Sequence, residues 1–302
     1  IPILYRKVGN LARLMGLYCK SLTNCYKKRF DLVSASLDTS TYWKGNRKMI
    51  DVHCHMLPGI DDGSKDLMTS LDLAQAAVAD GITHALMTPH HMNGRYTNHA
   101  ADVIRMTDEF QGELDRNNIP LTIYPCQEVR INGQLLDAID HGDILTCDAS
   151  GHYVLIEFPS DDVPLYTQNM LFEVMQRGMI PVIVHPERNT RLMKHPGLLY
   201  QMIERGAFAQ VTASSYVGTF GKKVQQFSED IIDAGLAHVF ASDAHHLPGR
   251  SYEMSDAFKR LTRKRGEKKV HIFEENARAL VNGDPLVRFN EHKVEKRLLS
   301  RY

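Results

Sequence analysis

The sequence predicts an α/β fold built as a closed or distorted (β/α) barrel of seven strands, and three observations point to it. Short apolar runs alternate with amphipathic helical segments along residues 49–302, which is typical of a parallel sheet covered by helices. About seven such units occupy some 200 residues, which favours a barrel over an open sheet. Four helical segments stop at a glycine, the residue that most readily takes the left-handed conformation that ends a helix.

Each predicted strand is a mostly apolar run of four to seven residues. In chain order the strands cover residues 50–53, 83–88, 121–127, 153–158, 181–185, 207–212 and 237–242. Helical periodicity lies between them at residues 70–80, 165–177, 197–205 and 222–234. These helices are expected to stop at Gly81, Gly178, Gly206 and Gly235, and the next strand begins a few residues after each. The short connections indicate parallel strands.

Charge divides the chain into two regions. Residues 1–48 contain ten Lys and Arg and two Asp and Glu, a net charge of +8, whereas residues 49–302 contain 26 and 34, a net charge of −8. Apolar residues at helical spacing within 8–22 are compatible with a basic amphipathic helix that contacts a membrane surface or a partner. We favour the alternative, an appended segment that is loosely ordered or a translation remnant. The expected division is therefore a basic extension, 1–48, and one domain, 49–302.

The overall composition narrows the functional class. The 36 Lys and Arg balance the 36 Asp and Glu, so the chain has no overall positive charge that would favour binding of nucleic acid. The chain has no run of 18 apolar residues, and its five cysteines form no CxxC motif. These features predict a cytoplasmic globular protein with no transmembrane segment, disulfide scaffold or zinc ribbon.

Side chains that can bind metals follow most of the predicted strands. The carboxyl ends of all strands meet at one mouth of a (β/α) barrel, so these side chains are expected to converge there. Imidazole and carboxylate ligands suit Mn, Fe or Zn, and crowded carboxylates repel one another unless cations neutralise them. Nine ligands are too many for one ion, so we predict a multinuclear site of the kind used in metal-assisted hydrolysis. The candidates are His53, His55, Asp62, His90, Glu128, Glu157, His185, Asp243 and His245.

The motifs around these residues resemble the PHP (polymerase and histidinol phosphatase) superfamily. Within it they are most similar to the manganese-dependent tyrosine-protein phosphatases of bacterial capsule and exopolysaccharide loci. The resemblance runs from about Met49 to Leu286 and rests on MIDVHCH with GIDDG, TPHH, CQE, LIEF, VHPER, and ASDAH followed by PGR. It implies a distorted (β/α)7 TIM-like barrel, the PHP fold, forming a metal-dependent phosphatase domain over residues 49–302.

The resemblance also implies three divalent metal ions, manganese before Fe, Zn or Mg. The first set of ligands would be His53, His55, Glu128 and Asp243. The second set would be Glu128, as a bridge, with Glu157 and His185, and the third set Asp62, His90 and His245. Arg188 and Arg250 would hold the phosphate, since a guanidinium fork matches phosphate oxygens.

The implied reaction is hydrolysis of phosphotyrosine by metal-bound hydroxide, without a phosphoenzyme intermediate. Phenolate, with a pKa near 10, leaves with little acid assistance. No cysteine is followed six positions later by arginine, so a cysteine-based phosphatase loop is excluded. The expected substrate is the phosphorylated tail of a bacterial tyrosine kinase that regulates polysaccharide synthesis. The alternatives are a small-molecule phosphatase such as histidinol phosphatase, an exonuclease, which the net charge of −8 disfavours, and a metal-binding regulatory module without catalysis.

Overall fold

The structure is a computed structural model that describes residues 49–294. Its described strands, all paired in parallel, form two sheets with the orders β1-β2-β4 and β3-β5-β6-β7-β8-β9. The strands are β1 Met49–Cys54, β2 Ile82–Met87, β3 His90–His91, β4 Thr122–Pro125, β5 Glu128–Arg130, β6 Tyr153–Glu157, β7 Ile180–Val184, β8 Phe208–Thr212 and β9 Val239–Ala241. Every predicted strand segment therefore contains a strand.

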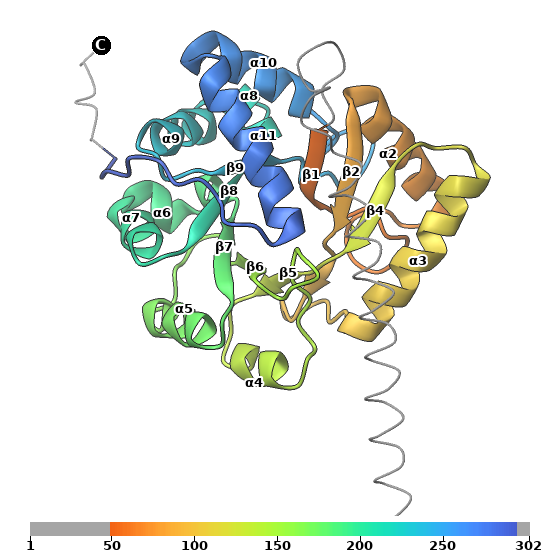
Figure 1. The fold of residues 1–302 in the computed structure, drawn as a ribbon, viewed down its shortest axis with the longest axis horizontal. Coiled ribbons are helices and arrows are strands. Elements are labelled where there is room, and N and C mark those ends of the chain that lie inside the picture. The colour runs from red at the N-terminus through yellow and green to blue at the C-terminus, as the bar shows by residue number, and fades with distance from the viewer. Residues whose placement is uncertain (1–48, 295–302) are drawn as a thin grey trace, which may run out of the picture.

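Most of the helices lie around the outside of the sheets (Figure 1). They are α2 Leu67–Asp80, α3 Ala100–Arg116, α4 Leu135–Asp140, α5 Thr167–Gln176, the 3-10 turn η2 Pro186–Arg188, α6 Thr190–Lys194, α7 Gly197–Glu204, α8 Ala213–Val217, α9 Lys222–Asp233, α10 Met254–Arg265 and α11 Glu267–Asn282. The four predicted helices correspond to α2, α5, α7 and α9. All four predicted stop glycines have positive φ, and at Gly81 (φ 98°) the backbone N–H donates to the carbonyls of Ala77 and Val78.

The two sheets together form the distorted barrel that the sequence predicts. β3 follows β2, and β5 follows β4, each after a short break containing or adjoining a proline, a residue that cannot donate a ladder hydrogen bond. After each break a second short strand, β3 or β5, continues beyond the predicted segments 83–88 and 121–127, and the sequence analysis did not indicate these two strands. On the other side, the His55 N–H donates to the Ala244 carbonyl at 2.9 Å, and the Asp243 N–H donates to the His53 carbonyl at 2.8 Å. Backbone hydrogen bonds thus join β1 to the segment after β9.

Alternation along the strands sends apolar residues to the barrel interior and polar residues to its carboxyl end. Tyr153 and Leu155 belong to the buried interior cluster, and Glu157 follows them at the same parity. In the same way, Val239 and Ala241 precede Asp243. The end where the strands begin is covered by α11, whose side chains join the same cluster. The interior is therefore closed at one end, and the polar residues gather at the other.

No helix among residues 49–294 is long and apolar enough to cross a membrane. The predicted basic extension, 1–48, and its suggested membrane contact lie outside the described residues.

Candidate metal centre

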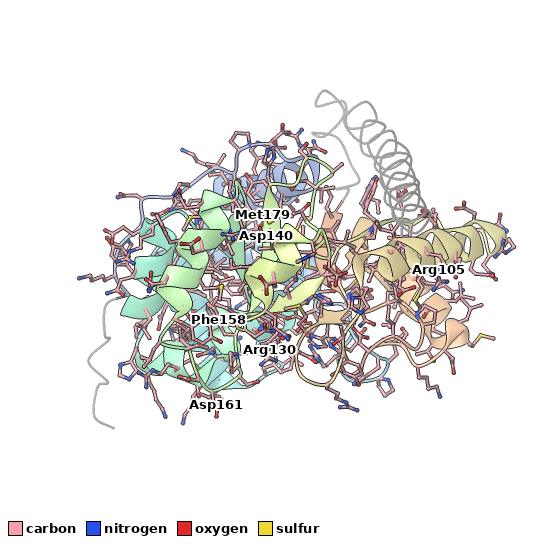
Figure 2. All side chains as sticks on the ribbon, turned by 90° about the horizontal axis from the view of Figure 1, so that it is seen from below. Arg105, Arg130, Asp140, Phe158, Asp161 and Met179 are labelled. Atoms are coloured by element: carbon pink, nitrogen blue, oxygen red, sulfur yellow. The ribbon has the colours of Figure 1, made fainter. Side chains whose placement is uncertain are left out.

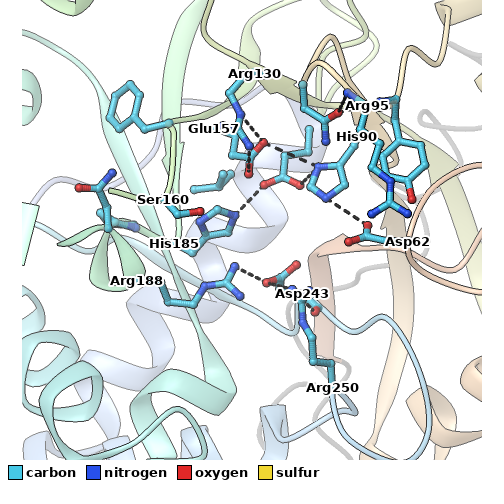
Figure 3. Close-up of a pocket in the computed structure, with 17 residues that line it drawn as sticks. Asp62, His90, Arg95, Arg130, Glu157, Ser160, His185, Arg188, Asp243 and Arg250 are labelled. Atoms are coloured by element: carbon cyan, nitrogen blue, oxygen red, sulfur yellow. Dashed lines mark hydrogen bonds and ion pairs between the residues drawn. The ribbon is translucent and has the colours of Figure 1, made fainter. Parts of the chain in front are cut away.

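The structure brings all nine predicted ligands together at the carboxyl ends of the strands, and six of them line one cavity (Figure 3). His53 is the penultimate residue of β1 and His55 directly follows this strand; Asp62 lies in the next loop. The others belong to β3, β5 and β6 or directly follow β7 and β9: His90, Glu128, Glu157, His185, Asp243 and His245. Figure 2 shows the direction of the strands: Met179, before β7, lies above Phe158, which follows β6. Within the described residues, these ligands form four overlapping groups of three or four side chains whose ligand atoms lie within 4.8 Å of one another.

The first set is the most compact. The Nε2 atoms of His53 and His55 lie 3.1 Å apart. Each lies 3.3–3.4 Å from Oε2 of Glu128 and 3.5 Å from Oδ1 of Asp243. Tetrahedral ligands about 2.1 Å from one ion lie roughly 3.4 Å from one another. These spacings therefore suit a divalent cation, and the buried Oε2 of Glu128 makes no hydrogen bond, although Nδ1 of His90 lies 2.8 Å from it.

The third set lies on the neighbouring side of the cavity. Oδ1 of Asp62 is 3.3 Å from Nε2 of His90 and 3.6 Å from Nε2 of His245. The ring of His55 lies 3.9 Å from that of His245, centroid to centroid, so the first and third sets adjoin. The buried Nε2 of His245 also has no hydrogen-bond partner. This set likewise offers lone pairs to a cation.

The second set is only partly assembled. Oε1 of Glu128 lies 2.6 Å from Nε2 of His185, but Glu157 falls in a separate group with His90 and Glu128. Both oxygens of Glu157 accept hydrogen bonds from Arg130, from Nε at 2.8 Å and from Nη2 at 2.9 Å. Arg130 was not among the predicted site residues. Its guanidinium neutralises the carboxylate that the second set needs.

The electrostatics of the carboxylates indicate a site built for cations. Burial and the negative charge of Glu128 raise the pKa of Glu157 to about 7, although His90 and Arg130 oppose this shift. Burial also disfavours ionised Glu128, but the charges of His53 and His90 and the hydrogen bond from His185 hold its pKa well below the usual value. Two carboxylates this close ionise together only when positive charge is supplied.

Backbone strain coincides with two of the ligands. His185 (φ 34°) and Asp243 (φ 51°) both have left-handed backbone conformations, which are uncommon outside glycine. His185 directly follows β7, and Asp243 lies two residues after β9. At both positions the left-handed backbone changes the direction of the chain at the mouth of the barrel. Burial and the charge of Arg188 lower the pKa of His185 to about 4, so its ring is neutral and can act as a ligand.

Two buried groups that the sequence analysis missed orient the first-set histidines. Nδ1 of His55 donates to Oδ2 of Asp61 at 2.7 Å, and Nδ1 of His53 lies 3.1 Å from Oε1 of Gln210. A carboxylate can only accept here, so Nδ1 of His55 carries a proton and Nε2 is the atom left to bind a cation. Gly63 lets the Asp61 loop approach, because a Cβ there would lie 2.1 Å from the His55 carbonyl oxygen.

The predicted phosphate-binding residues Arg188 and Arg250 line the same cavity, which has a volume of about 340 Å³. Nη2 of Arg188 and, at 2.5 Å, Nη2 of Arg250 both pair with Oδ2 of Asp243. Asp243 thus joins the predicted metal ligands to the predicted phosphate-binding residues. Divalent cations and an oxyanion can approach the same point.

Comparison with known proteins agrees with this geometry. Residues 49–282 match the family described as capsular polysaccharide synthesis, CpsB/CapC. Tyrosine-protein phosphatase YwqE of Bacillus subtilis is 39% identical over 251 residues, covering 83% of this chain and 98% of YwqE. The putative tyrosine-protein phosphatase CapC of Staphylococcus aureus is 34% identical over 250 residues, covering 83% and 94%.

Solved structures show the same relation. One solved structure superposes on this chain with a TM-score of 0.79 at 38% identity. It comes from the work on YwqE of B. subtilis and CpsB of Streptococcus pneumoniae, which are described as unique metal-dependent tyrosine phosphatases. It covers 82% of this chain and all of that one. The Escherichia coli phosphotriesterase homology protein shares the fold, with a TM-score of 0.52 at 12% identity over 77% of this chain and 98% of its own.

Proposed function

The chain belongs to the CpsB/CapC capsular polysaccharide synthesis family, and we propose that it is a metal-dependent protein-tyrosine phosphatase. The observation that carries the proposal is the convergence of nine candidate ligands in overlapping groups, six of which line one cavity together with Arg188 and Arg250. A vestigial regulatory site would not need arginines placed beside the ligands. Small-molecule phosphatase activity, such as histidinol phosphatase activity, is the less favoured alternative, because the similar relatives are named as tyrosine-protein phosphatases.

We propose that the three ligand sets hold three divalent ions, manganese in the cell. When bound, such ions would lower the pKa of water toward about 7 and neutralise phosphoryl oxygens. The chain's own residues would do the rest. Asp61 and Gln210 hold the imidazoles of His55 and His53 with Nε2 directed toward Glu128 and Asp243. This arrangement requires no side-chain nucleophile.

The two arginines would bind and orient the substrate phosphate. Arg188 and Arg250 are permanently charged, and each directs Nη2 to the same oxygen of Asp243. A phosphoryl group beside Asp243 would receive hydrogen bonds from both sides. The two guanidinium groups would also stabilise negative charge that develops on its oxygens in the transition state.

The proposed substrate is a phosphotyrosine segment of a partner protein, the tail of a bacterial tyrosine kinase that regulates capsule or exopolysaccharide synthesis. Disordered tails suit such a role because they bind reversibly and change state by phosphorylation. We place the enzyme in the cytoplasm. In support, the buried thiols of Cys126 and Cys147 are free, with sulfur atoms 3.6 Å apart, as expected in a reducing compartment.

The test combines metal analysis with hydrolysis of a phosphotyrosine peptide. Purified protein should contain transition metal, lose activity on chelation and recover it on addition of Mn²⁺. The rate on phosphotyrosine peptide should exceed that on histidinol phosphate. Metal-loaded protein that hydrolyses neither compound would contradict the proposal, and preference for histidinol phosphate would replace it with the small-molecule alternative.

A further inference from the structure

The cavity is lined by four arginines, and one of them differs from the others. Arg130 pairs with Glu157, and Arg188 and Arg250 pair with Asp243. Arg95 also lines the cavity, but no carboxylate among residues 49–294 lies within 4.0 Å of its guanidinium. Its side chain is exposed, and its guanidinium carbon lies 5.0 Å from the centre of the Tyr96 ring. Arg95 is thus a cation at the mouth that the described chain does not neutralise.

The segment that carries Arg95 is held in place by hydrogen bonds. Oδ1 of Asn93 accepts from the backbone N–H groups of Arg95 at 3.0 Å and Tyr96 at 2.7 Å. Nδ2 of Asn98 donates to the His90 carbonyl at 2.8 Å. The Tyr96 ring lies nearly parallel to that of His90, at 7° and 6.2 Å. A rim tied in this way to the metal-ligand segment can hold a side chain in a fixed position for recognition.

The position of Arg95 separates it from the proposed phosphate site. In Figure 3, Arg95 lies on the side of Asp62 and His90, whereas Arg188 and Ser160 lie on the opposite side. The phosphoryl group of a substrate is expected beside Asp243, where Arg188 and Arg250 meet. A charged group that reaches Arg95 at the same time therefore belongs to another part of the substrate.

Resting on the proposed phosphatase function, we infer that Arg95 is a specificity-determining residue that binds a carboxylate side chain flanking the phosphotyrosine. The Tyr96 ring supports the guanidinium through a cation–π contact, leaving its N–H groups free for an incoming carboxylate. The pair would be exposed at the rim, where ion pairs are weak because solvent screens the charges. The expected selectivity for an acidic flank is therefore about two- to fivefold, and it should fall as salt is raised.

The experiment uses the full chain loaded with Mn²⁺ and three substrates: a phosphotyrosine peptide flanked by aspartates, the same peptide flanked by asparagines, and free phosphotyrosine. Wild type should prefer the aspartate peptide by about two- to fivefold, through KM and not kcat. Arg95→Gln should bring the ratio of the two peptides close to one. Arg95→Glu should reverse it, and Arg95→Lys should keep most of it.

Arg105→Gln is the matched control. Arg105 is also an exposed arginine, lies on α3 and pairs with Glu109, and Figure 2 shows it well apart from Arg130 and Phe158 of the cavity. This variant should retain the wild-type ratio. An unchanged ratio in both Arg95→Gln and Arg95→Glu would overturn the inference. An equal loss on free phosphotyrosine would also overturn it, since Arg95 would then act on the phosphate itself.

A second readout separates this inference from the proposed function. Calorimetry with the same peptides carrying a phosphonate analogue of phosphotyrosine measures affinity without turnover. The ratio of dissociation constants should follow the same order across wild type and variants. If the wild type binds these peptides without hydrolysing phosphotyrosine, the phosphatase proposal fails, whereas the affinity ratio still supports or refutes the role of Arg95.

Discussion

Replacing Asp61 with asparagine tests whether the metal centre depends on the group that orients His55. Oδ2 of Asp61 accepts from His55 Nδ1 at 2.7 Å and from the His90 N–H at 3.1 Å, while Oδ1 accepts from the Gly63 N–H at 2.9 Å. An asparagine has one carbonyl oxygen, so in either orientation its NH₂ group faces a donor. The variant must break a bond or move the proton of His55 to Nε2, which removes the lone pair offered to the metal. Replacing a group that holds a metal-binding histidine in place lowers the metal affinity about 10- to 100-fold, which corresponds to roughly 1.4–2.7 kcal/mol of binding free energy.

Calorimetric titration of metal-free protein with Mn²⁺ measures this loss directly, and circular dichroism of the same samples reports whether the fold persists. Asp66→Asn makes the same chemical change five residues further on. Asp66 is exposed and caps α2 by accepting from the Thr69 N–H at 2.9 Å, a role that asparagine performs equally well. That control should bind Mn²⁺ as wild type does. Unchanged Mn²⁺ affinity in Asp61→Asn would refute the reasoning that His55 must be held by its neighbour.

Three further predictions follow from the same geometry. Glu128→Gln should abolish nearly all phosphotyrosine hydrolysis and lower the metal content measured by elemental analysis, because its carboxylate lies close to ligands of several sets. A retained rate would show that Glu128 does not bridge two ions. Gly63→Ala should lower the free energy of unfolding by about 1–3 kcal/mol in denaturant titrations, since its Cβ would collide with the His55 backbone; wild-type stability would show that the loop can move away. Burial raises the pKa of Asp51 to about 6, so its folded state holds a proton that the unfolded chain loses near pH 4. The stability of metal-free protein should therefore fall by up to about 3 kcal/mol relative to Asp51→Asn as pH rises from 4 to 6, and parallel pH profiles would contradict this.

The fold could be predicted because its signals are local. Apolar runs and glycine stops depend on neighbouring residues, and Gly81 shows why: its left-handed φ of 98° ends α2 directly before β2. The candidate ligands could be predicted because a parallel barrel places every strand end at one mouth. Glu157 and Asp243 are far apart in the chain, and this rule alone predicts that both lie at the mouth of the barrel.

The supporting groups could not be predicted, because their roles depend on side-chain direction across the barrel. Asp61 and Asp62 are adjacent, yet Asp61 turns inward to His55 and Asp62 remains partly exposed beside His90. Gln210 lies 157 residues from its partner His53, and only the register of β8 places it inside. The alternation of Phe208 and Gln210 on one face is the signal that could have identified it.

The charge balance of the cavity gives a physical reason for arginines beside the proposed metal ligands. Five ionisable carboxylates face three paired arginines there: Asp61, Asp62, Glu128, Glu157 and Asp243 against Arg130, Arg188 and Arg250. Without bound cations, the histidines and arginines supply the positive charge beside these carboxylates. Divalent ions would supply it when bound. With the three divalent ions proposed above bound, the excess of negative charge would become an excess of positive charge, which suits a phosphate dianion. The arginines that pair with Asp243 would then be free to turn toward substrate. Metal loading should therefore strengthen binding of inorganic phosphate in calorimetry, and equal phosphate affinity before and after loading with Mn²⁺ would contradict this coupling.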